Sequence, residues 1–100
     1  MSLWAGNRCT FVGDVKYKRV RLGAYPNADL YQLTAYTIAT GLRSGMLIYA
    51  AGEDPAAVHE VIHLGKLLEL VALDLSQQPN GILDQVGQLA GRIRDAAVAA

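Results

Sequence analysis

An aspartate and a lysine two residues apart, in the segment "GDVKYKR" at positions 13–19, are the first residues whose types and spacing could do chemistry. The segment alternates as a β-strand does, and successive strand residues point to opposite faces, so Asp14 and Lys16 are predicted to share one face. A carboxylate is a ligand for a hard cation such as Mg²⁺, and a neighbouring ammonium can stabilise negative charge that grows on a phosphate. From the residues alone the pair is more typical of an ordinary ion pair on a solvated strand, so both interpretations stay open at this point.

A second pair, Gln32 and Tyr36, follows in the segment "NADLYQLTAYTIATG". Leucine and isoleucine recur there at helical spacing and a glycine follows, which predicts a helix. Asn27 is a suitable N-cap for it, and Asp29 suits its first turn. On such a helix Gln32 and Tyr36 are neighbours one turn apart. They either contact a site beside the helix or form a simple pair on its surface.

The remaining segments predict a sheet with helices packed on it. Gly6-Asn7 separates the two strands of a hairpin, "GMLIYAAG" at 45–52 indicates a buried strand, and two further strands meet at a Gly65-Lys66 turn. A closing amphipathic helix is marked by Ile82, Val86, Leu89 and Ile93. The alanine-rich tail after Asp95 is expected to fray. The predicted order is ββ-α-βββ-α, an α/β or α+β fold with a mixed β-sheet, in a single domain over residues 1–100.

Composition narrows the classes of protein. One hundred residues, 52% of them hydrophobic, are enough for one core. Nine basic and nine acidic side chains cancel, so the chain has no overall positive field, and contact with nucleic acid needs a local patch. The lone cysteine, Cys9, together with the lack of a signal peptide or a long apolar run, predicts a cytoplasmic protein that does not associate with membranes.

Four segments carry a resemblance to a known family: "GDVKYKR", "NADLYQLTAY", "GMLIYAAGE" and "ALDLS", in that order and spacing. The D-V-K of residues 14–16 is similar to the (D/E)xK strand of the PD-(D/E)xK nuclease superfamily, and residues 32–36 are similar to the QxxxY helix of its RecB-like branch. More closely, the four segments resemble the C-terminal nuclease domain of McrC, a subunit of 5-methylcytosine-dependent restriction systems. The resemblance covers about residues 3–76 and implies a restriction-endonuclease-like core.

This resemblance implies metal-dependent hydrolysis of DNA phosphodiester bonds. Asp14 and the backbone carbonyl of Val15 would bind Mg²⁺ or Mn²⁺, and Lys16 would stabilise the attacking water or the phosphate. Gln32 and Tyr36 would hydrogen-bond to the catalytic groups or to the DNA backbone. Phosphate contacts beyond the strand would come from Lys18, Arg19 and Arg21. A solvated strand end is the other interpretation of these three basic residues.

The resemblance also implies partners, namely DNA and a GTP-driven AAA+ subunit of the McrB type, and it is compatible with a homo-oligomer. The chain has no P-loop motif, so it is not that motor itself. In the family a first acid, from a Pro-Asp motif, lies upstream of the (D/E)xK strand, whereas residues 1–13 contain no Asp or Glu. We therefore expect that acid to fall just before this segment, and the isolated chain to be nearly inactive. An inactive nuclease-like binding or assembly subunit is the alternative.

The segment "HEVIH" at 59–63 satisfies H-E-x-x-H, which on a helix binds zinc through two histidines and uses the glutamate as general base. With Glu69 as a third ligand it would make a small metallopeptidase. Two strands are the favoured interpretation, because a helix running on through residues 65–75 would be apolar on all sides in its second half. On a strand, His59 and His63 are about 13 Å apart, given a rise of ~3.3 Å per residue, and cannot share a zinc. They are then expected on an exposed strand face.

Overall fold

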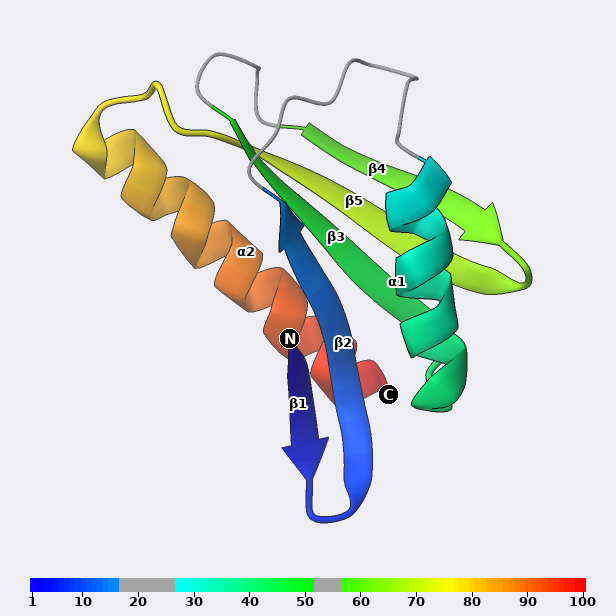
Figure 1. The fold of residues 1–100 in the computed structure, drawn as a ribbon. Helices are drawn as coiled ribbons and strands as arrows, with labels where there is room; N and C mark the ends of the chain where they lie inside the picture. The colour runs from blue at the N-terminus through cyan, green and yellow to red at the C-terminus, as the bar shows by residue number, and fades with distance from the viewer. Residues whose placement is uncertain (17–26, 52–56) are drawn as a thin grey trace.

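The structure, a computed structural model, describes residues 1–16, 27–51 and 57–100. Its elements follow the predicted ββ-α-βββ-α order (Figure 1). They are β1 (Ser2–Ala5), β2 (Arg8–Lys16), α1 (Asn27–Ala39), β3 (Ser44–Ala51), β4 (Ala57–His63), β5 (Lys66–Asp74) and α2 (Pro79–Ala99). None of the helices in these ranges combines the length and the apolar character needed to cross a membrane.

The five strands form one mixed sheet in the order β1-β2-β3-β5-β4, with a helix on each face (Figure 1). β2, β3 and β5 are parallel, whereas the edge strands β1 and β4 are antiparallel to their neighbours. Because β2 and β3 are adjacent and parallel, the chain has to cross over between them, and α1 lies in that crossover. The α+β class and the mixed sheet predicted from the sequence are therefore confirmed.

The core on the α1 side of the sheet is the tighter of the two. It consists of Leu30, Leu33, Leu47, Tyr49, Val61, Leu68 and Leu70. Gly45 at the start of β3 allows the close approach of the helix, because a Cβ at this position would lie 2.5 Å from Thr37 Oγ1 and 3.0 Å from Leu33 Cδ1. The α1 helix is thus held directly against β3.

On the other face, α2 rests on the sheet without burying any residue completely. Its contacts come from Leu89, Ile93, Ala96 and Ala97, which pack against a cluster of Phe11, Met46, Ile48 and Val71. The expected fraying after Asp95 is wrong, since α2 continues to Ala99. The physical reason is that the small alanines let the helix lie close to the apolar sheet.

Two local features differ from the sequence prediction. The β4–β5 turn consists of Leu64 and Gly65, with φ of 49° and 77°, one residue earlier than expected. Positive φ at both central residues is the requirement of a type I′ hairpin turn. In the β1–β2 hairpin, a register irregularity between Leu3 and Trp4 places Cys9 in one cluster with Val12, although simple alternation would put these two on opposite faces.

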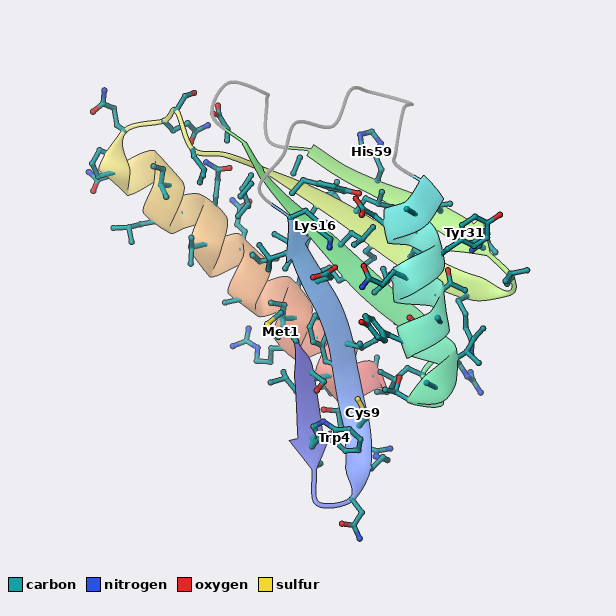
Figure 2. All side chains as sticks on the ribbon, in the orientation of Figure 1. Met1, Trp4, Cys9, Lys16, Tyr31 and His59 are labelled. Atoms are coloured by element: carbon teal, nitrogen blue, oxygen red, sulfur yellow. The ribbon has the colours of Figure 1, made fainter. Side chains whose placement is uncertain are left out.

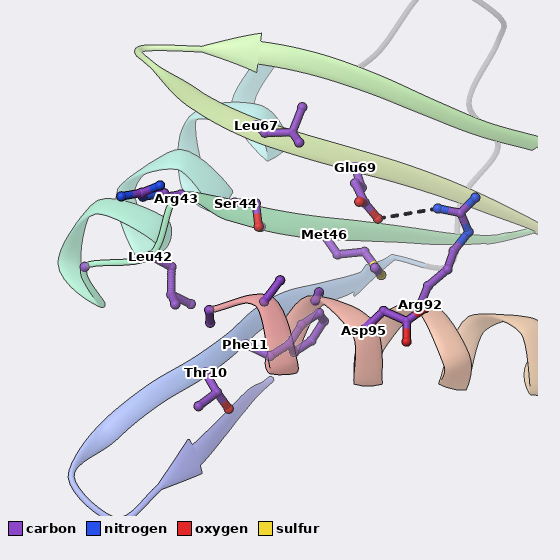
Figure 3. A pocket seen from close by; sticks show the side chains of 15 residues that line it. Thr10, Phe11, Leu42, Arg43, Ser44, Met46, Leu67, Glu69, Arg92 and Asp95 are labelled. Carbon is purple, nitrogen blue, oxygen red and sulfur yellow. Dashed lines mark ion pairs between the residues drawn. The ribbon is translucent and has the colours of Figure 1, made fainter.

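A pocket of about 640 Å³ lies between the last turns of α2 and the end of the sheet at which β3 and β5 begin (Figure 3). Phe11, Leu42 and Met46 supply apolar lining, and an Arg92–Glu69 ion pair of 3.7 Å lies across one side. None of the residues predicted for the nuclease site that the structure describes lines this pocket, whereas Glu69, the third ligand of the zinc alternative, does.

Candidate active site

Asp14 and Lys16 lie together at the end of β2, on the face that α1 covers. Lys16 Nζ is 3.0 Å from Asp14 Oδ2, and the two side chains are 29% and 27% exposed for Lys16 and Asp14 respectively. Figure 2 shows Lys16 at the end of β2 that lies opposite the β1–β2 hairpin turn. The predicted shared face is therefore observed as a direct ion pair that solvent can reach.

A second carboxylate, which the sequence did not assign to the site, stands on α1. Asp29 is only 7% exposed, and the Tyr49 hydroxyl donates a hydrogen bond to its Oδ2 at 3.3 Å. Tyr49 is the Cα partner of Lys16 in the β2–β3 register, so the two side chains point to the same face. The helical spacing of Asp29 and Gln32 was the signal that could have revealed it, because residues three apart share one side of a helix.

Gln32 and Tyr36 form a hydrogen-bonded pair on the surface of α1. Gln32 Nε2 donates to Tyr36 Oη at 3.2 Å, and the Tyr36 side chain is 47% exposed. Tyr36 is also close enough to raise the pKa of Lys16. The interpretation as a pair on the helix surface is therefore confirmed. Contact of this pair with a catalytic group stays a prediction.

The charge state of Lys16 follows from its neighbours. The hydrogen bond that it donates to Asp14 is the main cause that raises the pKa of Lys16 above its ordinary value of 10.5, and the Asp14 charge is the second. Burial lowers this pKa, and Asp29 and Tyr36 raise it again. Lys16 is therefore an ammonium at neutral pH. An ammonium cannot accept a proton from water, but it can stabilise negative charge on a phosphate.

The one predicted side-chain ligand for Mg²⁺, Asp14, offers an oxygen donor of the kind that hard divalent cations prefer. The Asp14 carboxylate is reachable from solvent, and Val15, whose carbonyl is the other predicted ligand, lies between Asp14 and Lys16 in β2. Within residues 1–16, 27–51 and 57–100, no three His, Cys, Asp or Glu side chains gather into a metal-binding group. Water would then supply most of the ligands, as it does at many Mg²⁺ sites.

The three basic residues predicted to contact phosphates, Lys18, Arg19 and Arg21, belong to residues 17–26, which lie outside the described part of the chain. Their role stays a prediction.

The H-E-x-x-H segment lies in β4, so the predicted strand is confirmed and the helical spacing that brings two histidines to one zinc is not formed. The expectation of an exposed face is wrong. Val61 packs into the core on the α1 side, and strand alternation places His59 and His63 on the same face. His63 Nδ1 is 2.8 Å from Thr34 Oγ1, and the His63 ring meets that of Tyr31 edge-on, with centroids 4.9 Å apart.

This contact predicts the tautomer of His63. The Thr34 hydroxyl has one hydrogen and donates it to Leu30 O at 2.7 Å, so it must accept from His63, which then carries its proton on Nδ1. We expect ¹⁵N NMR at neutral pH to show the Nδ1–H form, and Thr34→Val to shift it towards Nε2–H and cost about 1–2 kcal/mol in free energy of unfolding. Thr40→Val is the control, because the Thr40 hydroxyl bonds only to backbone carbonyls among the contacts seen. An Nε2–H form in the wild type would contradict the assignment.

The fold thus brings Asp14 and Lys16 together on β2, joins Asp29 of α1 to Tyr49 of β3, and pairs Gln32 with Tyr36 on α1. No protein-family model matches the chain, and no curated protein matches it either.

Proposed function

We propose that this chain is an McrC-like nuclease domain that hydrolyses DNA phosphodiester bonds with Mg²⁺ or Mn²⁺. The observation that supports the proposal best is the Asp14–Lys16 ion pair at the end of β2, a carboxylate and an ammonium within reach of solvent and of each other. Tyr36 of α1, the helix that follows β2 in the sequence, is among the groups that raise the pKa of Lys16. The succession of β2, α1 and the parallel strand β3 also supports a restriction-endonuclease-like core.

The roles of the residues follow from their chemistry. A bound divalent cation supplies Lewis-acid activation of water and of the phosphate. Asp14 would hold this cation with the Val15 carbonyl. Lys16, as an ammonium, would stabilise the negative charge that develops on the phosphate oxygens. Tyr36, half-exposed and hydrogen-bonded by Gln32, would donate its hydroxyl to the DNA backbone.

The proposal includes the setting of the family. The substrate would be DNA that carries 5-methylcytosine, the location would be the cytoplasm, and the partner would be an AAA+ GTPase of the McrB type. Lys18, Arg19 and Arg21 would position the phosphate backbone, a role that carries no sequence information. Self-association of the chain is compatible with all of this.

One observation favours the alternative of an inactive assembly subunit. One carboxylate oxygen of Asp14 is already paired with the Lys16 ammonium at 3.0 Å. A single carboxylate competes poorly for a hydrated cation, so the isolated chain should be nearly inactive.

The test is a cleavage assay on methylated and unmethylated DNA, with the chain alone and with its AAA+ partner and GTP. We expect cleavage of the methylated DNA by the complex, dependent on Mg²⁺ or Mn²⁺ and stopped by a chelator, and almost none by the chain alone. A version extended by an upstream Pro-Asp segment should cut faster than the shorter one. If the complex and the extended version both leave DNA intact, the assembly-subunit function replaces this proposal.

A further inference from the structure

The strand β4 forms one edge of the sheet, and no described strand pairs with its outer side. The opposite edge strand, β1, is four residues long and has a register irregularity, and both features make a strand edge a poor template for further pairing. β4 is seven residues long, pairs with β5 in an unbroken register and contains neither lysine nor proline. Of the two edges, β4 is therefore the one suited to accept a further strand.

Every second residue of β4 has backbone groups that point outward. In an antiparallel pair, residues that exchange both hydrogen bonds alternate with residues whose N–H and C=O point away from the partner strand. His63 and Lys66 flank the two-residue turn between β4 and β5, so they form a hydrogen-bonded pair. The N–H and C=O groups of Val58, Glu60 and Ile62 then point away from β5.

The side chains of these three residues lie on the α2 face of the sheet, beyond the reach of α2. Val58 is the Cα partner of Val71, which belongs to the cluster under α2, and strand alternation places Glu60 and Ile62 on the same face. Val58 is 42% exposed and Ile62 is 77% exposed. Figure 1 shows β4 at the edge of the sheet away from α2. Outward backbone groups and uncovered apolar side chains therefore coincide in residues 58–62.

Glu60, at the centre of this stretch, determines which charge a partner needs. It is exposed, and its Cα partner on β5 is Glu69, so two carboxylates stand opposite each other on one face. Like charges in this arrangement destabilise a sheet, and opposite charges stabilise it. Glu69 is paired with Arg92 at 3.7 Å, whereas no ion pair joins Glu60 to another residue that the structure describes. A basic side chain on an added strand would give Glu60 the counterion that Arg92 gives Glu69.

A second copy of the chain fits this edge poorly. Two β4 strands related by a two-fold axis pair antiparallel, and the register that pairs all seven residues places the two copies of Glu60 opposite each other. This like-charge contact disfavours self-pairing. A strand from another protein that carries a basic residue at this position turns the same contact into an attraction.

We propose that β4 is a docking edge for an extended segment of another protein, in which a lysine or arginine stands opposite Glu60 and apolar residues on either side meet Val58 and Ile62. The segment pairs antiparallel with β4, the more stable of the two pairings, and bonds to its outward backbone groups. The backbone bonds supply affinity, and the basic residue supplies specificity. This inference is independent of the proposed nuclease function.

Binding is tested with the ¹⁵N-labelled chain and two synthetic peptides, Thr-Val-Thr-Lys-Thr-Val-Thr and the same peptide with Glu in place of Lys. We expect the Lys peptide to bind and to slow amide hydrogen exchange at Val58, Glu60 and Ile62. The Glu peptide should bind at least about fivefold more weakly, because an attraction is replaced by a repulsion. N-methylation of the Lys and both Val residues of the Lys peptide should abolish binding, because it removes the N–H groups that face β4.

Two pairs of variants separate the contacts. Glu60→Lys should reverse the preference and bind the Glu peptide better, whereas Asp84→Lys, the same charge change on the exposed side of α2, should keep the wild-type preference. Ile62→Lys should weaken binding of the Lys peptide about tenfold or more, because it removes an apolar contact and adds a like charge. Val98→Lys, at a position of α2 that is 80% exposed, should bind as the wild type does.

Three results overturn the inference: no slowed exchange in β4 at millimolar Lys peptide, slowed exchange at β1 in its place, or equal binding of the two peptides. Analytical ultracentrifugation tests the other occupant of the edge, and we expect a wild type that does not pair through β4. A wild-type dimer that Ile62→Lys dissociates and Val98→Lys leaves intact would show that a second copy occupies the edge, which also overturns the inference.

Discussion

Replacing Lys16 by methionine is expected to abolish DNA cleavage and to leave the fold intact. Methionine keeps the length of the side chain and removes its charge, and loss of one group that stabilises transition-state charge typically lowers kcat by about 10²–10³-fold. Stability should hardly change, because the Asp14–Lys16 ion pair is accessible to solvent and such pairs contribute little to folding. Cleavage rates with the AAA+ partner and circular dichroism measure the two effects.

The matched control is Lys66→Met. The Lys66 ammonium donates a hydrogen bond to the backbone carbonyl of Leu42 at 2.7 Å. Lys66 is the first residue of β5 and lies at the end of the sheet remote from the site. This variant should lose some stability and keep the wild-type cleavage rate, the reverse of Lys16→Met. Lys16→Arg keeps the charge in a larger planar group and should retain only part of the activity. If Lys16→Met cuts DNA as fast as the wild type, Lys16 is not catalytic.

Gly45→Ala is expected to lower the free energy of unfolding by about 2–3 kcal/mol, near the upper end of what overpacking a core costs. The added Cβ would lie 2.5 Å from Thr37 Oγ1 and 3.0 Å from Leu33 Cδ1, and both of these side chains are buried. Thr37 cannot rotate away without giving up its 2.8 Å hydrogen bond to Leu33 O. The α1 helix would have to shift off β3.

Gly87→Ala provides a control of opposite sign. Gly87 lies on the exposed side of α2. A Cβ added at this position would have no heavy atom within 4 Å, apart from its chain neighbours and the nearby backbone of its own helix. Alanine is the better helix former by about 1 kcal/mol, so this variant should be more stable than the wild type. Urea unfolding of the two variants measures both effects. Wild-type stability in Gly45→Ala would show that α1 is not held against β3 as the structure has it.

The sequence predicted those parts of the fold that depend on neighbouring residues. Period-two alternation indicated β2, and helical spacing indicated α1. The face shared by Asp14 and Lys16 needed nothing beyond the pleat of one strand, and it is observed. The pairing of Gln32 with Tyr36 likewise needed only the turn of one helix.

What the sequence did not reveal depends on contacts between distant segments. Asp29 is held by the Tyr49 hydroxyl of β3, and no pattern within one element shows which residues of two elements meet, so its spacing from Gln32 on the helix was the sole local sign. The turn at Leu64 was missed because leucine disfavours positive φ, which made Gly65-Lys66 the better local choice. His63 was expected in solvent because its partner Thr34 lies on another element, 29 residues earlier in the chain.

The unequal burial of the two helices has a consequence for how the molecule opens. Hydrogen exchange reports local unfolding, and an element without fully buried side chains separates from a domain at a lower free energy than one that is locked into the core. The α2 helix has no fully buried side chain, whereas α1 buries Leu33, Thr34 and Thr37 in the interior. When α2 detaches transiently, the α1 side of the sheet would therefore stay assembled. The Asp14–Lys16 ion pair on that side would persist through fluctuations that expose the part of the core under α2.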